Sequence, residues 1–295
     1  MNRFFAKHPA ILMLLTALLS GCAGGGDINE WRNFSHADTN RQYHLYVPDG
    51  LLATNDLLPM VINLHGSTPA PSWIPTFGSF FQQVITGMPT HAAQHDYVVV
   101  HPQGRLLGDT QYWVTSDASD TGFINALVTF LTAELPIDPD RVFLTGFSSG
   151  GILTWKLACE HSERYAAIAP VAANRRAAMD CPGSRPVPVM GFHGTEDPTV
   201  AYSGGRYAME SWAAEHGCQQ QEVFFQEADS TCERWHDCNN NSEMLFCSSE
   251  GAGHTWPSGP GSIVISAAGY GKTSYTLDAT DRIWAFFDRV STAVE

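Results

Sequence analysis

A glycine-flanked serine turn limits what this chain can fold into more than any other feature. The apolar run Arg141-Val142-Phe143-Leu144-Thr145 leads into Gly146-Phe147-Ser148-Ser149-Gly150, and an apolar helical pattern follows from Ile152. A strand that turns sharply into a helix needs small residues around the turn, and it exposes the central side chain. A serine held in this way can act as a nucleophile once a base accepts its proton. The alternative, a small residue in an ordinary tight turn, is disfavoured by the two glycines and by the preceding strand.

Apolar strands and amphipathic helices alternate along the rest of the chain. Strands are predicted at 41–48, 59–66, 97–101, 141–145, 167–171 and 187–192. Helices are predicted within 77–95, at 121–135, at 207–216 and from 278 onward. This alternation predicts an α/β fold whose central sheet is mainly parallel, with helices on both faces. Without repeats or a composition shift, residues 32–295 are expected to form one domain. Ligands bind at the carboxyl ends of such strands, so the loops that follow strands should carry the site.

The N-terminal residues predict export. Arg3 and Lys7 precede an apolar stretch over residues 10–19, and Leu19-Ser20-Gly21-Cys22 follows it. This pattern resembles a lipoprotein signal over residues 1–21, with a lipid on Cys22 that contacts the membrane and a flexible tether over 22–31. The alternative is an ordinary secretory peptide that is cleaved nearby. A formal net charge of −14 disfavours a nucleic-acid partner.

Six cysteines remain after Cys22, and an even number in an exported protein predicts disulfides. Segments 230–235 and 243–248 are expected to form a hairpin around the turn-rich segment 237–241. Folding the hairpin about its centre places Cys232 near Cys247, which leaves Cys218 with Cys238 and Cys159 with Cys181. Metal binding is the alternative, but none of the six has a paired C-x-x-C spacing.

Three loops carry residues suited to acyl transfer, in the order serine, acid, histidine. Ser148 comes first, Asp197 follows the strand at 187–192, and His254 lies in Gly251-Ala252-Gly253-His254-Thr255-Trp256-Pro257. This is the chain order of the α/β-hydrolase triad. His254 is expected to take the proton of Ser148, and Asp197 to hold the imidazole in the correct tautomer.

The acid has rivals. Glu196 is a neighbouring fallback, and three other aspartates lie between the serine and the histidine: Asp180, Asp229 and Asp237. Asp197 is preferred because it alone closely follows a predicted buried strand.

The oxyanion of acyl transfer needs backbone donors. They are expected from the amide of Ser149 and from the loop after the strand at 59–66, where the Ser67 amide is preferred to that of Thr68.

The chain resembles the esterase family that includes polyhydroxybutyrate depolymerases and bacterial feruloyl and acetylxylan esterases. The matching segments cover most of the chain: Arg41-x-Tyr43-x-x-Tyr46-x-Pro48, Leu64-His65-Gly66, Pro102-Gln103-Gly104, Gly122-Phe123-Ile124, 137–146, Leu157-Ala158-Cys159, Ala169-Pro170-Val171-Ala172, 192–197, 253–257, Ala279-Thr280 and Ile283-Trp284. The resemblance implies the triad Ser148, Asp197 and His254, with no metal or organic cofactor. Ala252 and the proline-rich segment 67–71 depart from the family pattern.

Weaker candidate sites lie elsewhere. His91 and His95 have the i,i+4 spacing of two zinc ligands on a helix, but the glutamate of His-Glu-x-x-His is missing, so no metal is expected. Trp113 and Trp256 could line a substrate pocket, or they could simply pack in the core.

The function expected is that of an exported serine carboxylic-ester hydrolase that acts through an acyl-enzyme. Its substrate would be a small or oligomeric ester, namely a hydroxyalkanoate oligomer or a feruloylated or acetylated saccharide. A surface-anchored binding lipoprotein without catalysis and a peptidase on the same fold are the alternatives.

Overall fold

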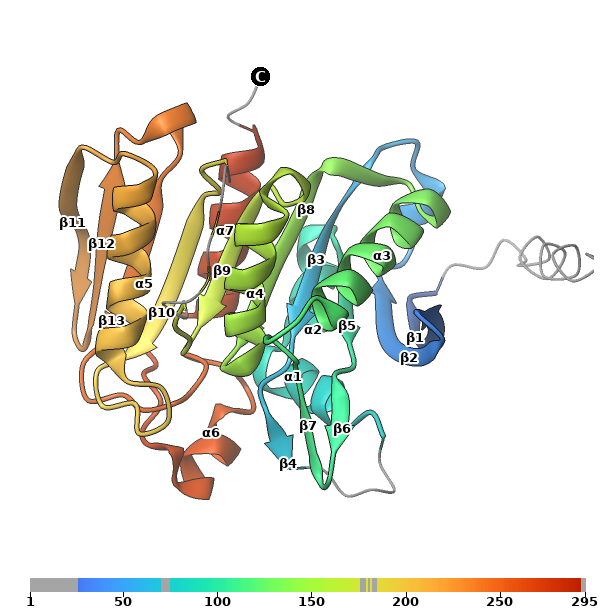
Figure 1. Ribbon diagram of the computed structural model, residues 1–295, viewed down its shortest axis with the longest axis horizontal. Coiled ribbons are helices and arrows are strands. Elements are labelled where there is room, and N and C mark those ends of the chain that lie inside the picture. The colour runs from blue at the N-terminus through green and yellow to red at the C-terminus, as the bar shows by residue number, and fades with distance from the viewer. Residues whose placement is uncertain (1–25, 70–74, 176–178, 180, 182–184, 293–295) are drawn as a thin grey trace, which may run out of the picture.

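A ten-stranded sheet runs through the centre of the molecule (Figure 1). The computed structural model describes residues 26–292 except 70–74, 176–178, 180 and 182–184; the expected leader over 1–21 and Cys22 lie outside this range. In spatial order the strands are β1 (Ile28–His36), β2 (Thr39–Val47), β5 (Val98–Pro102), β3 (Leu58–Leu64), β8 (Ile137–Phe147), β9 (Ala167–Val171), β10 (Val189–Gly194), β13 (Met244–Ser249), β12 (Ser230–His236) and β11 (Gln220–Glu227).

The middle of the sheet is parallel and its two edges are antiparallel. Strands β5, β3, β8, β9, β10 and β13 pair in parallel, whereas β2 and β1 on one side and β12 and β11 on the other add antiparallel neighbours. The predicted α/β class and mainly parallel central sheet are therefore confirmed. All carboxyl ends of the parallel strands meet at one edge, which is where a site is expected.

Helices cover both faces of the sheet. One face carries α3 (Ser119–Glu134), α4 (Ser149–Glu160) and α5 (Tyr202–Glu215), which lie in front of the sheet in Figure 1. The other carries α1 (Phe77–Thr86), α2 (Met88–His95) and α7 (Ala279–Thr292). Successive β8 residues alternate between the two cores: Val142 and Leu144 pack with the first set of helices, and Phe143 with the second. A strand that is apolar on both faces needs this double cover.

Smaller elements lie beyond the carboxyl edge of the sheet. They are a three-stranded sheet of β4 (Thr68–Pro69), β7 (Thr110–Tyr112) and β6 (Arg105–Leu107), the short helix α6 (Ser262–Ile265) and a π-helical turn over Ser266–Tyr270. In Figure 1 the small sheet and α6 both lie at the lower end, toward which β9 and β10 point. No helix within the described range is long and apolar enough to cross a membrane.

The predicted disulfide pairs are confirmed. Bonds join Cys232 to Cys247, Cys218 to Cys238 and Cys159 to Cys181. The first of these lies in the expected hairpin, where β12 and β13 place the two residues directly opposite each other. The register argument succeeds because both strands are short and the turn between them is compact.

Two predictions need correction. The tether predicted over 22–31 is too long, because residues from Ile28 onward form β1, and the Asp27 carboxylate already accepts hydrogen bonds from the Tyr46 hydroxyl and the Asp49 amide. The domain therefore starts before residue 32. The segment 77–95, within which one helix was predicted, holds two, since Gly87 adopts a left-handed φ of 64° that ends α1 and starts α2.

Candidate active site

Ser148 occupies a sharp turn between β8 and α4. Its backbone has φ 54° and ψ −119°, a strained conformation for a residue with a side chain. The neighbouring glycines make the turn possible, since a Cβ on Gly150 would lie 2.3 Å from the Leu64 carbonyl oxygen and one on Gly146 would lie 2.5 Å from the Gly150 backbone. The Ser148 amide donates to the Val171 carbonyl oxygen at 2.9 Å, which ties the turn to β9.

Asp197 lies in the loop after β10, with a fully buried carboxylate. Oδ1 accepts the backbone N–H groups of Thr199 and Val200, both at 2.8 Å. Oδ2 accepts from His254 Nδ1 at 2.7 Å and lies 3.4 Å from His193 Nε2. Burial by itself would raise the pKa of Asp197, but hydrogen bonds from His193, His254 and the Val200 amide together hold that pKa well below its usual range. These hydrogen bonds therefore favour the ionised carboxylate.

His254 lies against both Asp197 and the serine turn. Its ring is buried and its centroid is 4.7 Å from that of Phe147, the residue before Ser148. A Cβ on Gly194, at the end of β10, would lie 2.3 Å from the Ala252 carbonyl oxygen, so the histidine loop packs directly on the strand that leads to Asp197. Because Nδ1 is engaged by Asp197, Nε2 is the nitrogen left for a proton from serine. Among the described residues no hydrogen bond yet joins the Ser148 hydroxyl to this ring, a common state of such sites without substrate.

The rival acids are differently placed. Glu196 is exposed, and Asp237 pairs with His236. Asp229 accepts hydrogen bonds from three hydroxyls, those of Ser230, Ser274 and Thr276. Asp180 lies outside the described residues. Within the described chain, Asp197 is thus the carboxylate that the fold brings to His254.

The loop after β3 also approaches Ser148. A Cβ on Gly66 would lie 3.3 Å from the Ser148 Cβ, so Gly66 borders the serine, and the exposed Ser67 follows it in the chain. Ser149 is the first residue of α4, where backbone N–H groups have no partner within the helix. Ser149 is thus adjacent to Ser148 in the chain, and Ser67 is one residue beyond the glycine that borders it. Thr68 is turned into β4, and its hydroxyl donates to the Gly66 carbonyl oxygen at 2.8 Å.

His65 holds this loop in place, a role that the sequence did not reveal. Its Nε2 accepts the Gly104 N–H at 2.9 Å, so Nδ1 carries the proton and donates to the Gly66 carbonyl oxygen at 2.7 Å. Burial lowers the pKa of His65 to about 4, although the hydrogen bond to Gly66 opposes the shift. The neutral ring therefore links the loop after β3 to the loop after β5 through its two hydrogen bonds.

The two candidate pocket tryptophans are interior residues. Trp113 is 3% exposed and its Nε1 donates to the His65 carbonyl oxygen at 2.8 Å. Trp256 is fully buried and donates to Thr280 Oγ1 at 3.1 Å. Both tryptophans therefore pack in the core and do not line a substrate pocket. Each indole contacts a loop of the site and has no face exposed to a ligand.

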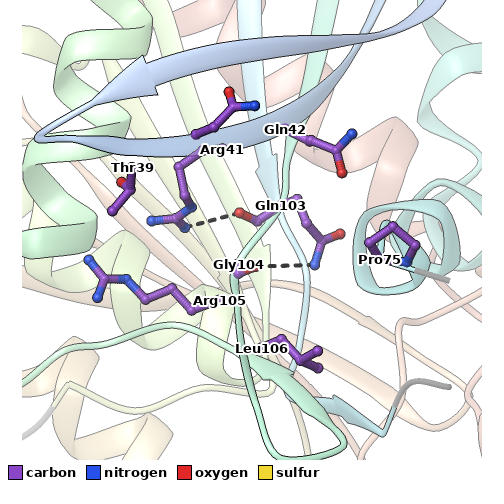
Figure 2. Close-up of a pocket in the computed structure, with 9 residues that line it drawn as sticks. Thr39, Arg41, Gln42, Pro75, Gln103, Gly104, Arg105 and Leu106 are labelled. Atoms are coloured by element: carbon purple, nitrogen blue, oxygen red, sulfur yellow. Dashed lines mark hydrogen bonds between the residues drawn. The ribbon is translucent and has the colours of Figure 1, made fainter. Parts of the chain in front are cut away.

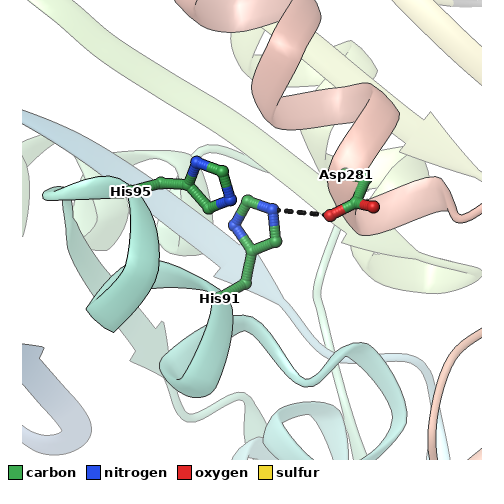
Figure 3. Close-up of side chains that lie close together, drawn as sticks. All are labelled: His91, His95 and Asp281. Atoms are coloured by element: carbon green, nitrogen blue, oxygen red, sulfur yellow. Dashed lines mark ion pairs between the residues drawn. The ribbon is translucent and has the colours of Figure 1, made fainter.

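The histidine pair of α2 lies far along the chain from the triad residues and meets α7 (Figure 3). His91 Nε2 is 2.9 Å from Asp281 Oδ1, its Nδ1 is 3.1 Å from the Tyr97 hydroxyl, and the His95 ring stacks on it at 4.1 Å. These groups lie within 4.8 Å of one another, close enough to hold a metal ion. The contacts with Asp281 and Tyr97 already give His91 a structural role, as a polar contact between α2 and α7.

Figure 2 shows a polar cavity of about 350 Å³, one of whose lining residues is Gly104, the donor to His65. Arg41, Gln103 and Arg105 are among its lining residues, and Arg41 donates to the Gln103 carbonyl oxygen at 3.0 Å and to buried Asp120 at 2.8 Å. Ser148, Asp197 and His254 do not line it. Its guanidinium groups are partly neutralised by Asp120, so we assign it no part in the chemistry of the serine.

Comparison with known proteins agrees with the fold and with the class of enzyme. The model of the phospholipase/carboxylesterase family matches residues 117–236. The "Probable feruloyl esterase C" of Aspergillus flavus is 29% identical over 221 residues, which cover 71% of this chain and 76% of that protein. A bifunctional acetylxylan esterase/xylanase of Neocallimastix patriciarum is 26% identical over 234 residues, covering 77% of this chain but only 32% of that longer protein.

Solved structures share the fold at lower identity. An acetyl xylan esterase from Aspergillus awamori superimposes with a TM-score of 0.62 at 17% identity, covering 88% of this chain and 99% of that one. A thermostable esterase gives a TM-score of 0.59 at 18% identity and covers 88% of this chain and 62% of that one. The fold and the relatives together define a carboxylic ester hydrolase of the α/β-hydrolase superfamily. Within it, the chain is similar to feruloyl and acetylxylan esterases.

Proposed function

We propose that this protein is an exported serine esterase that cleaves feruloylated or acetylated saccharides through an acyl-enzyme. The observation that carries the proposal is the 2.7 Å contact between Asp197 and His254 beside the Ser148 turn. It supports the assignment of Ser148 as nucleophile, His254 as base and Asp197 as the acid that orients the base. The names of the relatives support the substrate class, with a hydroxyalkanoate oligomer as the second candidate.

The reaction follows from this arrangement. Ser148 Oγ attacks the ester carbonyl carbon while its proton passes to His254 Nε2. The negative charge that forms on the carbonyl oxygen is stabilised by the backbone N–H groups of Ser149 and Ser67, and each such donor contributes about 100-fold to 1,000-fold in turnover. His254 then gives the proton to the departing alcohol. Water attacks the acyl-enzyme by the same route and releases the acid.

Labelling with a fluorophosphonate probe tests the role of Ser148. The native protein should be labelled covalently and should hydrolyse a p-nitrophenyl ester, and Ser148→Ala should lose both. Ser203→Ala, an exposed serine on α5, is the matched control. Absence of labelling in the native protein would favour a binding lipoprotein instead. A panel of methyl ferulate, acetylated xylan, hydroxybutyrate oligomers and a peptide separates the ester classes from the peptidase alternative.

Export is the second part of the proposal. The signal-like residues 1–21 and the three disulfides support it, because disulfides persist outside the reducing cytoplasm. A lipid on Cys22 would keep the catalytic domain at the cell envelope. Radiolabelled palmitate should enter the wild type and not Cys22→Ser, and the variant should leave the membrane fraction. Equal labelling of both proteins would contradict the anchor and leave ordinary secretion.

A further inference from the structure

Tyr270 is an exposed aromatic residue beside the proposed base. Its ring centroid is 6.1 Å from that of His254, and the two planes are inclined by 39°. Phe147 also contacts the imidazole but is only 7% exposed, whereas Tyr270 is 38% exposed. Of the two aromatic rings recorded against His254, Tyr270 is the one that a ligand can reach.

The backbone fixes Tyr270 relative to His254. The His254 amide donates to the Tyr270 carbonyl oxygen at 2.7 Å, and the Gly253 amide donates to the Lys272 carbonyl oxygen at 2.8 Å. Gly269 and Gly271 have φ values of 91° and 95°, so the residues on both sides of Tyr270 adopt conformations that favour glycine. A Cβ on Gly253 would lie 2.2 Å from the Tyr270 oxygen, which shows how closely the two segments approach. The ring therefore sits on a rigid support.

The surroundings leave the ring open. Ala267, Ala268 and Gly269, the small residues that precede it in the π-helical turn, are exposed and cannot cover it. The Tyr270 hydroxyl has no hydrogen-bond partner among the residues that the structure describes. An open aromatic face with a free hydroxyl suits a ligand that is apolar on one face and polar at its edge.

The chemistry of His254 indicates which part of the substrate lies here. The imidazole delivers its proton to the leaving alcohol oxygen, so the alcohol portion of the ester must stand next to His254. An exposed group next to the imidazole, as Tyr270 is, is therefore in a position to touch the alcohol.

We propose that Tyr270 is a platform that binds the saccharide alcohol of the ester. The axial hydrogens of a pyranose or furanose ring give it an apolar face, which would lie on the tyrosine ring, while its hydroxyl groups can bond the phenol at the edge. This inference rests on the proposed function and deepens it, because it makes the sugar, and not only the acyl group, a determinant of specificity.

Two substrates with the same acyl group test the platform: methyl ferulate and a feruloylated arabinoxylan oligosaccharide. Tyr270→Ala should lower kcat/KM for the oligosaccharide about 10-fold relative to methyl ferulate, mainly through KM, since burial of part of an aromatic side chain is worth about 1.4 kcal/mol. Tyr270→Phe keeps the ring and should retain most of the preference. Tyr207→Ala, another exposed tyrosine, on α5, is the control.

Binding without turnover gives an independent readout. In Ser148→Ala the oligosaccharide ester should bind about 10-fold more tightly than in Ser148→Ala/Tyr270→Ala, measured by calorimetry. If Tyr270→Ala loses kcat/KM equally on both esters, Tyr270 only supports His254. If kcat/KM is unchanged on both esters, Tyr270 has no role. Either result overturns the platform and leaves the proposed esterase activity intact. A wild type active on methyl ferulate with no preference for the sugar ester overturns it too. A wild type inactive on every ester overturns the proposed function itself.

Discussion

Replacing Asp197 by asparagine gives the sharpest test of the site. The carboxylate accepts two backbone N–H groups through Oδ1 and the His254 Nδ1–H through Oδ2. Asparagine can keep the first two bonds with its carbonyl oxygen, so the loop should stay folded. Its NH₂ group, however, faces Nδ1 and forces that nitrogen to accept. The ring proton then moves to Nε2, where it blocks transfer from Ser148.

The magnitude follows from the tautomer. An imidazole locked in the wrong tautomer costs a serine hydrolase about 10⁴-fold in kcat, or about 5.4 kcal/mol in activation free energy. Glu196→Gln is the matched control, since it removes an exposed carboxylate one residue away. Both variants should melt near the wild-type temperature. We expect Asp197→Asn to lose p-nitrophenyl acetate hydrolysis and to react with fluorophosphonate correspondingly slowly, while Glu196→Gln stays within a few-fold of wild type. An Asp197→Asn variant that retains more than a tenth of the activity, or an inactive Glu196→Gln, would refute the reasoning.

Three further predictions concern stability. Burial lowers the pKa of several histidines, His65 and His101 among them, so the unfolded chain binds more protons than the folded one below about pH 6.5. The free energy of unfolding, measured in urea, should therefore fall from pH 7.5 to pH 5. A profile that does not change with pH would contradict this. Replacing Cys232 and Cys247 by alanine opens a cross-link with a sequence separation of 15 residues and should cost about 3 kcal/mol of unfolding free energy, checked against the native protein without reductant. Gly150→Ala would press a Cβ into main-chain atoms and should yield insoluble or inactive protein, so a fully active variant would show that the turn can relax.

The sequence predicted the parts of the fold whose pattern is local. The parallel strands are apolar runs, and the β12–β13 register follows from a short polar turn between two cysteines. The edge strands β1 and β11 were not predicted, because β11 is exposed along almost its whole length and shows no buried face. The break at Gly87 was also missed, although a glycine followed two residues later by Pro89 is a signal in the sequence for the end of one helix and the start of another.

In the candidate site, too, the residues marked by a local sequence pattern could be predicted and the contacts between distant residues could not. Ser148, Asp197 and His254 could be proposed because each follows a recognisable strand or glycine-rich loop. The supporting contacts could not, because they join distant residues: Gly104 to His65, or Tyr270 back to His254 through a π-helical turn. No sequence motif around Tyr270 predicts that it is a site residue. Only the folded chain shows that its ring lies next to the His254 imidazole.

Two of the three disulfides involve elements next to the triad residues. Cys159 lies near the end of α4, the helix that starts directly after Ser148, and its bond to Cys181 ties that helix to a later part of the chain. Cys247 lies on β13, which pairs with β10, the strand that leads to Asp197. Oxidation therefore cross-links elements that carry the nucleophile and the acid, and a chain kept under reducing conditions would hold both less firmly.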